Sequence, residues 1–252
     1  CEEDGLGGDW TWEELLWVAG WRRGVAARGG GAGLQSGIMQ TILLASGNAK
    51  KLAELRALVS DLPVRLLTPS DLPEGLAEVD EDQPDFVGNA KKKALAAADD
   101  VAAQLPASNE SIGQEIWTLA DDSGLAVDAL QGAPGVYSAR YAGADGVGKD
   151  GANNAKLLRE MEHVLDAERT AAFHCVIAVA RHNEVLFTVE GSVDGVILRE
   201  ADGADGFGYD PLFFHVGSGT SFARLSAAEK ARVSHRGMAV KKLRERLADL
   251  LG

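Results

Sequence analysis

Short apolar runs and amphipathic stretches alternate in the first half of the chain. Residues 41–45 form an apolar run of strand length that stops at Ser46-Gly47-Asn48. Beyond it, Leu52, Leu55 and Val59 recur at helical spacing, with Asn48 as a candidate N-cap. A second apolar run follows at 64–67, and an alanine-rich helix is expected from about 85 to 103. This alternation predicts an α/β domain.

The second half begins with an expected helix at 150–165, followed by strands at 170–181, 185–192 and 195–199. Before that helix, residues 134–141 are expected to form a turn that enters an extended segment. Ser226 is placed to begin a short helix through a capping box. Val240, Leu243, Leu247 and Leu250 lie on one face of a last helix. Helices and strands thus alternate in the first half, and strands cluster in the second. This order predicts a mixed sheet flanked by helices.

Two adjacent acids end the apolar run in Thr118-Leu119-Ala120-Asp121-Asp122-Ser123-Gly124-Leu125. Neighbouring carboxylates repel each other and are costly to bury, so a strand that carries two of them to a sheet edge is expected to use them with a cation or as a base. Oxygen ligands of this kind suit Mg²⁺. The alternative is a turn, in which Asp and Ser bond to their own backbone and Gly supplies a positive φ.

Two other segments carry residues suited to binding an anion or a flat ring. Gly47 lies between an expected strand and a helix N-terminus, where backbone amides and the helix dipole favour an anion, and Lys50 or Lys51 could add charge. The alternative there is an ordinary capped helix.

Phe207-Gly208-Tyr209-Asp210 could stack a base and bond its edge, or it could be a surface turn whose aromatic rings enter the core. Lys230, His235 and Arg236 are further cations near helix starts, and a bound anion would compensate them.

Composition narrows the choice of partner. The chain has 25 basic and 38 acidic residues and a net charge of −13, so an anionic substrate must be drawn by a local basic site and a nucleic acid polymer is not expected. Cys1 and Cys175 form no disulfide framework or metal-ligand spacing. No apolar run approaches the roughly 18 to 20 residues needed to span a bilayer, which predicts a soluble protein.

The first part of the chain differs from the rest. It holds Trp10, Trp12, Trp17 and Trp21, and a glycine-rich stretch follows at 28–33. Acids among its first residues argue against a secretory signal or a transit peptide. Glycine-rich segments resist ordering. We therefore expect residues 1–38 to be a flexible or weakly helical leader and residues 39–252 to form the folded domain.

Taken together, these motifs resemble one family. The resemblance runs from about Met39 to the C-terminus, and it closely matches the inosine triphosphate pyrophosphatase family, whose members are XTP/dITP diphosphatases. The segments that carry it are Ser46-Gly47-Asn48-Ala49-Lys50-Lys51, Phe86-Val87-Gly88-Asn89-Ala90, Ala120-Asp121-Asp122-Ser123-Gly124-Leu125, Gly132-Ala133-Pro134-Gly135-Val136-Tyr137-Ser138-Ala139-Arg140-Tyr141, Gly206-Phe207-Gly208-Tyr209-Asp210-Pro211 and Ser234-His235-Arg236-Gly237.

The resemblance implies an elongated α/β fold and a cytoplasmic homodimer. It also implies hydrolysis of ITP, dITP and XTP to the monophosphate and pyrophosphate with Mg²⁺. By position, Asp122 would be the catalytic base and a metal ligand, and the metal would also meet Asp80 or Glu81, with Glu74 as a third option. The residues implied to bind substrate are Ser46, Gly47, Asn48, Ala49, Lys50, Lys51, Ser123, Phe207, Gly208, Tyr209, Asp210, Lys230, His235 and Arg236.

The chain departs from the family pattern around Gly88, where a glutamate is usual. If that glutamate helps to hold the metal, we expect a lower affinity for Mg²⁺ or a substitute ligand at Asp82 or Asp85. The segment from 104 to 115 also looks longer than is typical. Two other functions stay open: a pyrophosphatase of the septum-related family that acts on other nucleotides, and a nucleotide-binding regulator without catalysis.

Overall fold

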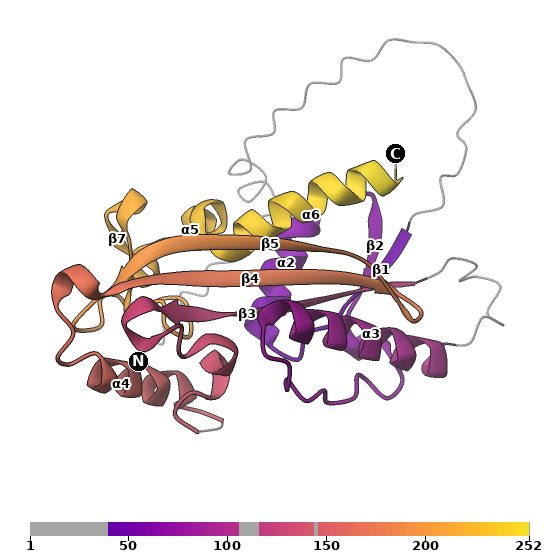
Figure 1. Cartoon of the computed structure of the whole chain (residues 1–252). Coiled ribbons are helices and arrows are strands. Elements are labelled where there is room, and N and C mark those ends of the chain that lie inside the picture. The colour runs from indigo at the N-terminus through magenta and orange to yellow at the C-terminus, as the bar shows by residue number, and fades with distance from the viewer. Residues whose placement is uncertain (1–39, 106–115, 144–145, 252) are drawn as a thin grey trace, which may run out of the picture. The chain divides into compact units, whose positions relative to one another are not determined.

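A computed structural model describes residues 40–105, 116–143 and 146–251 (Figure 1). The predicted leader, Met39 and most of the long segment before Trp117 lie outside these residues. The described residues belong to one unit that spans 38–252. None of its described helices is long and apolar enough to cross a membrane.

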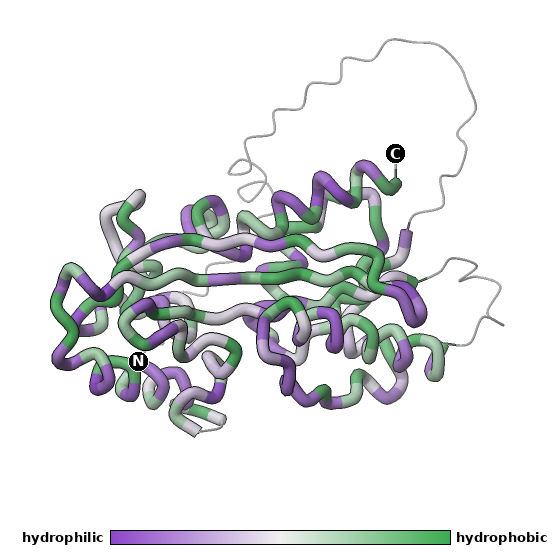
Figure 2. Tube along the Cα trace, in the orientation of Figure 1, coloured by the Kyte–Doolittle hydropathy of each residue, from purple (hydrophilic) through white to green (hydrophobic). Residues whose placement is uncertain are grey.

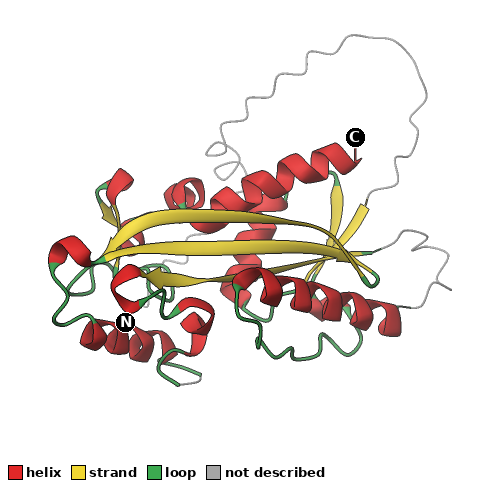
Figure 3. Ribbon diagram, viewed as in Figure 1, coloured by secondary structure: helices red, strands yellow, loops and turns green. Residues whose placement is uncertain are grey.

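The framework is a seven-stranded mixed sheet in the order β2-β1-β3-β4-β5-β6-β7. β1 (Gln40–Leu44) lies parallel to both β2 (Val64–Leu67) and β3 (Trp117–Val127). The remaining pairs are antiparallel and involve β4 (Thr170–Arg181), β5 (Glu184–Ile197), β6 (Phe213–His215) and β7 (Thr220–Ser221). The predicted mixed sheet with flanking helices is therefore confirmed (Figure 3).

Helices cover both faces of the sheet (Figure 1). α2 (Ala49–Val59) and α6 (His235–Leu251) share a core with β1 and β4 that includes Leu44, Leu55, Ile177 and Leu243. α3 (Phe86–Gln104) packs its alanines on the opposite face, against Leu43, Ala120 and Val176. Because successive strand residues point to opposite faces, Leu43 and Leu44 enter different cores. In Figure 2 the long strands carry apolar segments interrupted by polar ones, as expected for strands whose successive residues face different surroundings.

A third core lies where α4 (Lys149–Glu160) meets the ends of β3, β4 and β5, with Leu125, Leu157, Phe173 and Phe213 among its members. α5 (Ala227–Val233) begins with the predicted capping box of Ser226 and Glu229. Short 3-10 helices occupy Pro69–Asp71, Asp128–Leu130, Gly135–Arg140, Asp166–Glu168, Val216–Ser218 and Phe222–Arg224.

Several predicted boundaries were wrong. The acid motif neither ends a strand nor forms a turn, because β3 continues through it, paired with β4 from Thr118 to Val127. The strands expected at 185–192 and 195–199 are one strand, β5. Gly191 lies inside β5 because α6 crosses there, and a Cβ on Gly191 would lie 2.2 Å from the carbonyl oxygen of His235. The extended segment expected after Pro134 is a 3-10 helix, and α4 ends at Glu160.

Candidate active site

The two acids of the motif lie on opposite faces of β3. β1 ends opposite Leu119, so among the described residues no strand pairs with this side of β3 at the acids, although the other side pairs with β4. Alternation along the strand turns Asp121 toward α2 and α6 and Asp122 toward α3. The acids therefore reach an edge of the sheet in the middle of a strand, and each meets different partners.

Asp122 contacts two side chains of α3. Its Oδ1 accepts a hydrogen bond from Lys93 Nζ at 2.8 Å, and its Oδ2 accepts one from Asn89 Nδ2 at 3.3 Å. Asn89 and Lys93 are four residues apart and so share one helix face. Burial raises the pKa of Asp122 and outweighs the lowering effect of Lys93. The result is a buried carboxylate with increased basicity.

Glu81 is joined to Asp122 through the same lysine. Lys93 Nζ lies 3.0 Å from Glu81 Oε1, and Arg140 Nη1 donates to Glu81 Oε2 at 2.8 Å. Burial alone would raise the pKa of Glu81, but Lys93 and Arg140 outweigh it and lower that pKa. Burial opposes the charge of Lys93, yet Asp122 and Glu81 raise its pKa. Asp122, Lys93, Glu81 and Arg140 thus form a chain of alternating charge, which we call the acid cluster.

The substrate list drawn from the sequence missed Lys93 and Arg140. Arg140 occurs in one of the motifs that carry the resemblance, but nothing local connects it with Glu81, which lies 59 positions earlier. A signal for Lys93 did exist, because it lies one turn after Asn89 on a helix that is otherwise alanine-rich on its buried side.

Asp121 lies within a group of cations. Its Oδ2 is 3.2 Å from Lys51 Nζ and 3.5 Å from Arg236 Nη2, and Ser123 Oγ lies 3.4 Å away. Burial raises the pKa of Asp121, but Lys51 and Arg236 outweigh it and hold that pKa well below its usual range. Asp121 is therefore a permanent anion that balances two cations and does not act as a base near neutral pH.

Arg236 connects this group to the rest of the site. It is 2% exposed, pairs with Glu54 and donates to Ser123 Oγ at 3.1 Å. Its Nε is buried and has no hydrogen-bond partner among the described residues. Asp121 and Glu54 raise the pKa of Arg236 against the opposing effect of burial.

Phe207 lies among these cations. Lys50, Lys230 and Arg236 place their charged groups 5.9, 4.5 and 5.6 Å from the centre of its ring. Lys230 Nζ also lies 2.5 Å from Asp210, whose pKa is raised because burial outweighs the effect of that lysine. The residues Lys50, Lys51, Lys230, Arg236 and Phe207 will be called the cation cluster.

Two aromatic residues of the predicted base site are buried in the protein. Tyr209 is 3% exposed, packs in the third core and donates from its hydroxyl to Ser138 O at 2.9 Å. For Tyr209 the structure therefore has the second of the two alternatives, in which the aromatic ring enters the core. His235 stacks on Phe173 with ring centres 4.7 Å apart, and burial holds its pKa well below the usual value. Its buried Nδ1 has no partner among the described residues.

The start of α2 is capped by its own chain. Asn48 Oδ1 accepts from the backbone amides of Lys50 and Lys51 at 3.0 and 3.2 Å, and Ser46 Oγ accepts from the Asn48 amide at 3.3 Å. Gly47 is exposed, and a Cβ built on it would meet nothing within 4 Å. The amides of Lys50 and Lys51 are thus already bonded, so the lysine side chains are the stronger attraction for an anion here.

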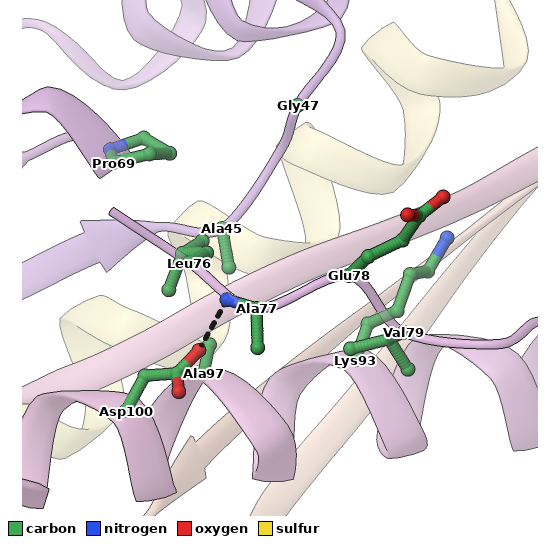
Figure 4. Close-up of a pocket in the computed structure, with 10 residues that line it drawn as sticks. All are labelled: Ala45, Gly47, Pro69, Leu76, Ala77, Glu78, Val79, Lys93, Ala97 and Asp100. Atoms are coloured by element: carbon green, nitrogen blue, oxygen red, sulfur yellow. Dashed lines mark hydrogen bonds between the residues drawn. The ribbon is translucent and has the colours of Figure 1, made fainter. Parts of the chain in front are cut away.

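A cleft of about 350 Å³ adjoins the acid cluster on the α3 side of the sheet (Figure 4). Lys93 of α3 and Gly47, which precedes α2, both line it, and Glu78 extends toward Lys93 in the same view. The floor of the cleft is apolar, and Asp100 holds the facing segment by accepting from the Ala77 amide at 2.9 Å. Lys93 is the member of the acid cluster that lines this cleft, so a ligand there would meet the cluster through the lysine ammonium group.

Of the acids proposed as metal ligands, only Glu81 and Asp122 share a contact with the same described side chain. Within the described part of the chain, no group of three or more His, Cys, Asp or Glu residues could hold a metal ion. Glu81 and Asp122 converge on one ammonium group, so the pair suits a cation that takes its other ligands from phosphate and water. Asp80 is exposed. The backbone amide of Glu74 donates to the side chain of Gln104. Gln104 lies about 16 Å from Lys93 along α3, from the helix rise per residue, so Glu74 is too far from Asp122 to share a metal ion with it.

Neither acid suggested as a substitute near Gly88 contacts Asp122. Asp85 caps α3 by accepting from the Gly88 amide at 2.7 Å, and Asp82 pairs with Lys92 at 2.9 Å on the surface. A Cβ on Gly88 would lie 2.8 Å from Gln83 Cβ, so any larger residue there requires Gln83 to move.

Comparison with known proteins identifies the family. The profile described as the Ham1 family matches residues 42–246. The chain belongs to the Ham1 family. A dITP/XTP pyrophosphatase of Desulforamulus reducens is 48% identical over 204 residues, which cover 81% of this chain and 94% of that relative. One from Escherichia coli is 44% identical over 211 residues, covering 83% and 98%.

Solved structures agree with this assignment. A Ham1 protein of Coxiella burnetii is 36% identical and aligns with a TM-score of 0.72 over 84% of this chain and all of that one. A nucleoside-triphosphatase, also titled dITP/XTP pyrophosphatase, of Mycobacterium abscessus is 40% identical with a TM-score of 0.60 over 81% of this chain and 97% of that one. The family and the fold predicted from the motifs are thereby confirmed.

Proposed function

We propose that this Ham1 protein hydrolyses ITP, dITP and XTP to the nucleoside monophosphate and pyrophosphate. The names of its relatives support this activity, and one observation on the chain itself carries it. The adjacent residues Asp121 and Asp122 place a cation cluster on one face of β3 and a basic buried carboxylate on the other. A triphosphate needs both positive charge to hold it and a base to activate water.

The cation cluster would hold the nucleotide. Lys50, Lys51, Lys230 and Arg236 would neutralise phosphate oxygens, together with the backbone around Ser46, Gly47, Asn48 and Ala49, and Ser123 would touch the nucleotide. Phe207 would stack on the base, while Gly208 and Asp210 would shape its pocket. The buried positions of Tyr209 and His235 suit roles in supporting the base site from within the protein or, for His235, a bond between its unpartnered Nδ1 and the base.

Asp122 would act as the general base. A water molecule attacks phosphorus, its proton passes to the Asp122 carboxylate, and the bond to the bridging oxygen breaks as pyrophosphate leaves with the electron pair. Burial favours this transfer because it raises the pKa of Asp122. Lys93, between Asp122 and Glu81, is placed to stabilise negative charge that develops during attack.

Glu81 and Asp122 would hold Mg²⁺, with Asp80 as a further candidate. When bound, Mg²⁺ supplies positive charge against the phosphate oxygens. The homodimer, the cytoplasmic location, the leader at 1–38 and the absence of a nucleic acid partner stay predictions.

Pyrophosphate release from ITP, XTP, GTP, ATP and dTTP at one Mg²⁺ concentration tests the proposal. We expect kcat/KM for ITP and XTP to exceed the value for ATP by up to about 10⁴-fold, because donors that meet the oxygen at C6 would face the amino group of adenine. Comparable values for ITP and ATP would refute the base preference. Faster release from dTTP would favour the septum-related alternative, and nucleotide binding without release would favour the regulator.

A further inference from the structure

Both peptide groups of Gly208 are held by α4. The Gly208 amide donates to Asp150 Oδ2 at 2.9 Å, and its carbonyl accepts from Asn154 Nδ2 at 3.0 Å. Asp150 and Asn154 are one helical turn apart and so present their side chains on the same face of α4. The helix thereby fixes the orientation of the residue that follows Phe207.

The backbone of Gly206 and Phe207 is held by residues outside α4. The Gly206 carbonyl accepts from Lys50 Nζ of α2 at 3.3 Å, and the Phe207 amide donates to Asp210 Oδ2 at 2.8 Å. Gly206 and Gly208 have φ values of +79° and +61°, a region in which glycine moves freely and other residues are strained. A segment with this freedom keeps one conformation only through such bonds, and two of the four that hold it come from α4, so α4 helps to set where the Phe207 ring lies.

The side chain of Asn154 has a buried oxygen that does not contribute to the stability of the fold. Its Oδ1 is buried and has no hydrogen-bond partner among the described residues. A buried polar atom without a partner is destabilising, and an apolar side chain of the same shape avoids that cost. The contact that Asn154 does make is the one to Gly208, which points to a role in holding this segment.

We propose that Asp150 and Asn154 are positioning residues that set the affinity for the nucleobase by fixing Phe207, an inference that rests on the proposed function. Neither residue has a contact with the lysines of the cation cluster, with Arg236 or with Asp122 among the described interactions. Any effect of the two residues therefore reaches the site through Phe207. We expect it mainly in base binding, because Lys51, Lys230 and Arg236 are also held by Asp121 and Asp210 and Asp122 is held by α3.

The test is Asn154→Leu, which fills the same space and removes the amide. We expect the KM for ITP and the Kd for inosine monophosphate, measured by calorimetry, to rise about 5-fold, as for the loss of one hydrogen bond. We expect kcat to stay within about twofold, and the inhibition constant of inorganic tripolyphosphate, which lacks a base, to stay unchanged. The melting temperature should stay close to that of the parent, because the loss of the bond to the Gly208 carbonyl is offset by removal of the unpartnered oxygen.

Three comparisons complete the design. Arg159→Ala changes an exposed residue on the same helix and should leave every value unchanged. Asp150→Asn keeps an oxygen that accepts from Gly208 and should raise KM less than Asp150→Ala does. Asn154→Ala serves if the leucine variant does not fold.

An unchanged KM for ITP would overturn the inference, and so would a parallel rise in the tripolyphosphate constant, which would show a general distortion. A parent that binds inosine monophosphate but releases no pyrophosphate would refute the proposed function and leave the binding comparison valid. A parent that binds no inosine nucleotide would overturn both.

Discussion

Replacing Asp121 by asparagine tests whether this carboxylate balances the buried charge of the cation cluster. The side chains of Asp121 and Arg236 are 1% and 2% exposed, and Lys51, which shares the same carboxylate oxygen, is 18% exposed. Asp121→Asn keeps the size of the side chain and removes its charge. Arg236 and Lys51 then lose a shared counter-ion inside the protein.

The expected loss follows from these contacts. Removing one partner of a buried ion pair costs about 3–5 kcal/mol. Arg236 keeps Glu54 and the hydroxyl of Ser123, and Lys51 can turn toward water, so the lower end applies. We expect the free energy of unfolding to fall by about 3 kcal/mol, which lowers the melting temperature by about 6–12 °C in a domain of this size.

Urea denaturation followed by circular dichroism at pH 7 measures this loss. The control is Asp61→Asn, which breaks the pair of Asp61 with Arg244, whose side chains are 37% and 29% exposed. An exposed pair of this kind contributes about 0–1 kcal/mol. If the two variants lose the same free energy, the buried pair does not have the role given to it here.

The pH dependence gives a second check. The folded-state pKa of Asp121 lies below its ordinary value of 3.8, because Lys51 and Arg236 outweigh burial. A lowered folded-state pKa contributes stability that is fully present above the unfolded pKa and is lost as pH falls through the folded pKa. The difference in stability between the parent and Asp121→Asn should therefore stay constant from about pH 5 to pH 7 and shrink below about pH 4. A difference that already changes between pH 5 and pH 7 would contradict the lowered pKa.

Three further predictions concern catalysis and the domain boundary. Asp122→Asn keeps the shape and removes the base, so ITP hydrolysis should fall about 100-fold or more, and a rate near that of the parent would mean that another group takes the proton. Lys93→Met should lower kcat about tenfold or more, whereas Lys92→Met, which breaks only an exposed pair with Asp82, should stay within about twofold; equal losses would contradict the role of Lys93. A chain that starts at Met39 should fold and turn over like the full chain, and lost solubility or activity would show that the leader packs on the domain.

Local patterns were enough to predict much of this fold. The strand near Thr41, the cap at Asn48 and the capping box at Ser226 are set by neighbouring residues, and the structure has all three. β3 was misjudged because its acids look like a strand end when read locally. Their charge is balanced by Lys51 and Arg236, which lie 70 and 115 positions away in the sequence, so no local pattern could show that the strand continues.

In the site, too, local motifs predicted part of the arrangement, and contacts between distant segments decide the rest. The motifs named the residues that surround Phe207, since these come from short segments with distinctive composition. They did not show that Tyr209 turns into the core, because that depends on the carbonyl of Ser138, which lies 71 positions earlier. Nor did they connect Glu81 with Arg140 or Gly208 with α4, because each of these contacts joins elements that only the folded chain brings together.

The position of the acids in mid-strand has a mechanistic consequence. Two neighbouring carboxylates differ in pKa only if their surroundings differ, and opposite faces of one strand provide that difference within a single peptide unit. Asp121 stays charged among cations, while Asp122 becomes the more basic group beside α3. Because β1 stops opposite Leu119, the edge of β3 is free of a strand partner on that side at this point among the described residues. A triphosphate that lies across this edge, next to the segment from Ser46 to Lys51, can contact the cations on one face while its reacting phosphate meets Asp122 on the other. A strand that paired with β3 at this point would occupy that edge, so the proposed reaction depends on the early end of β1 as well as on the acids.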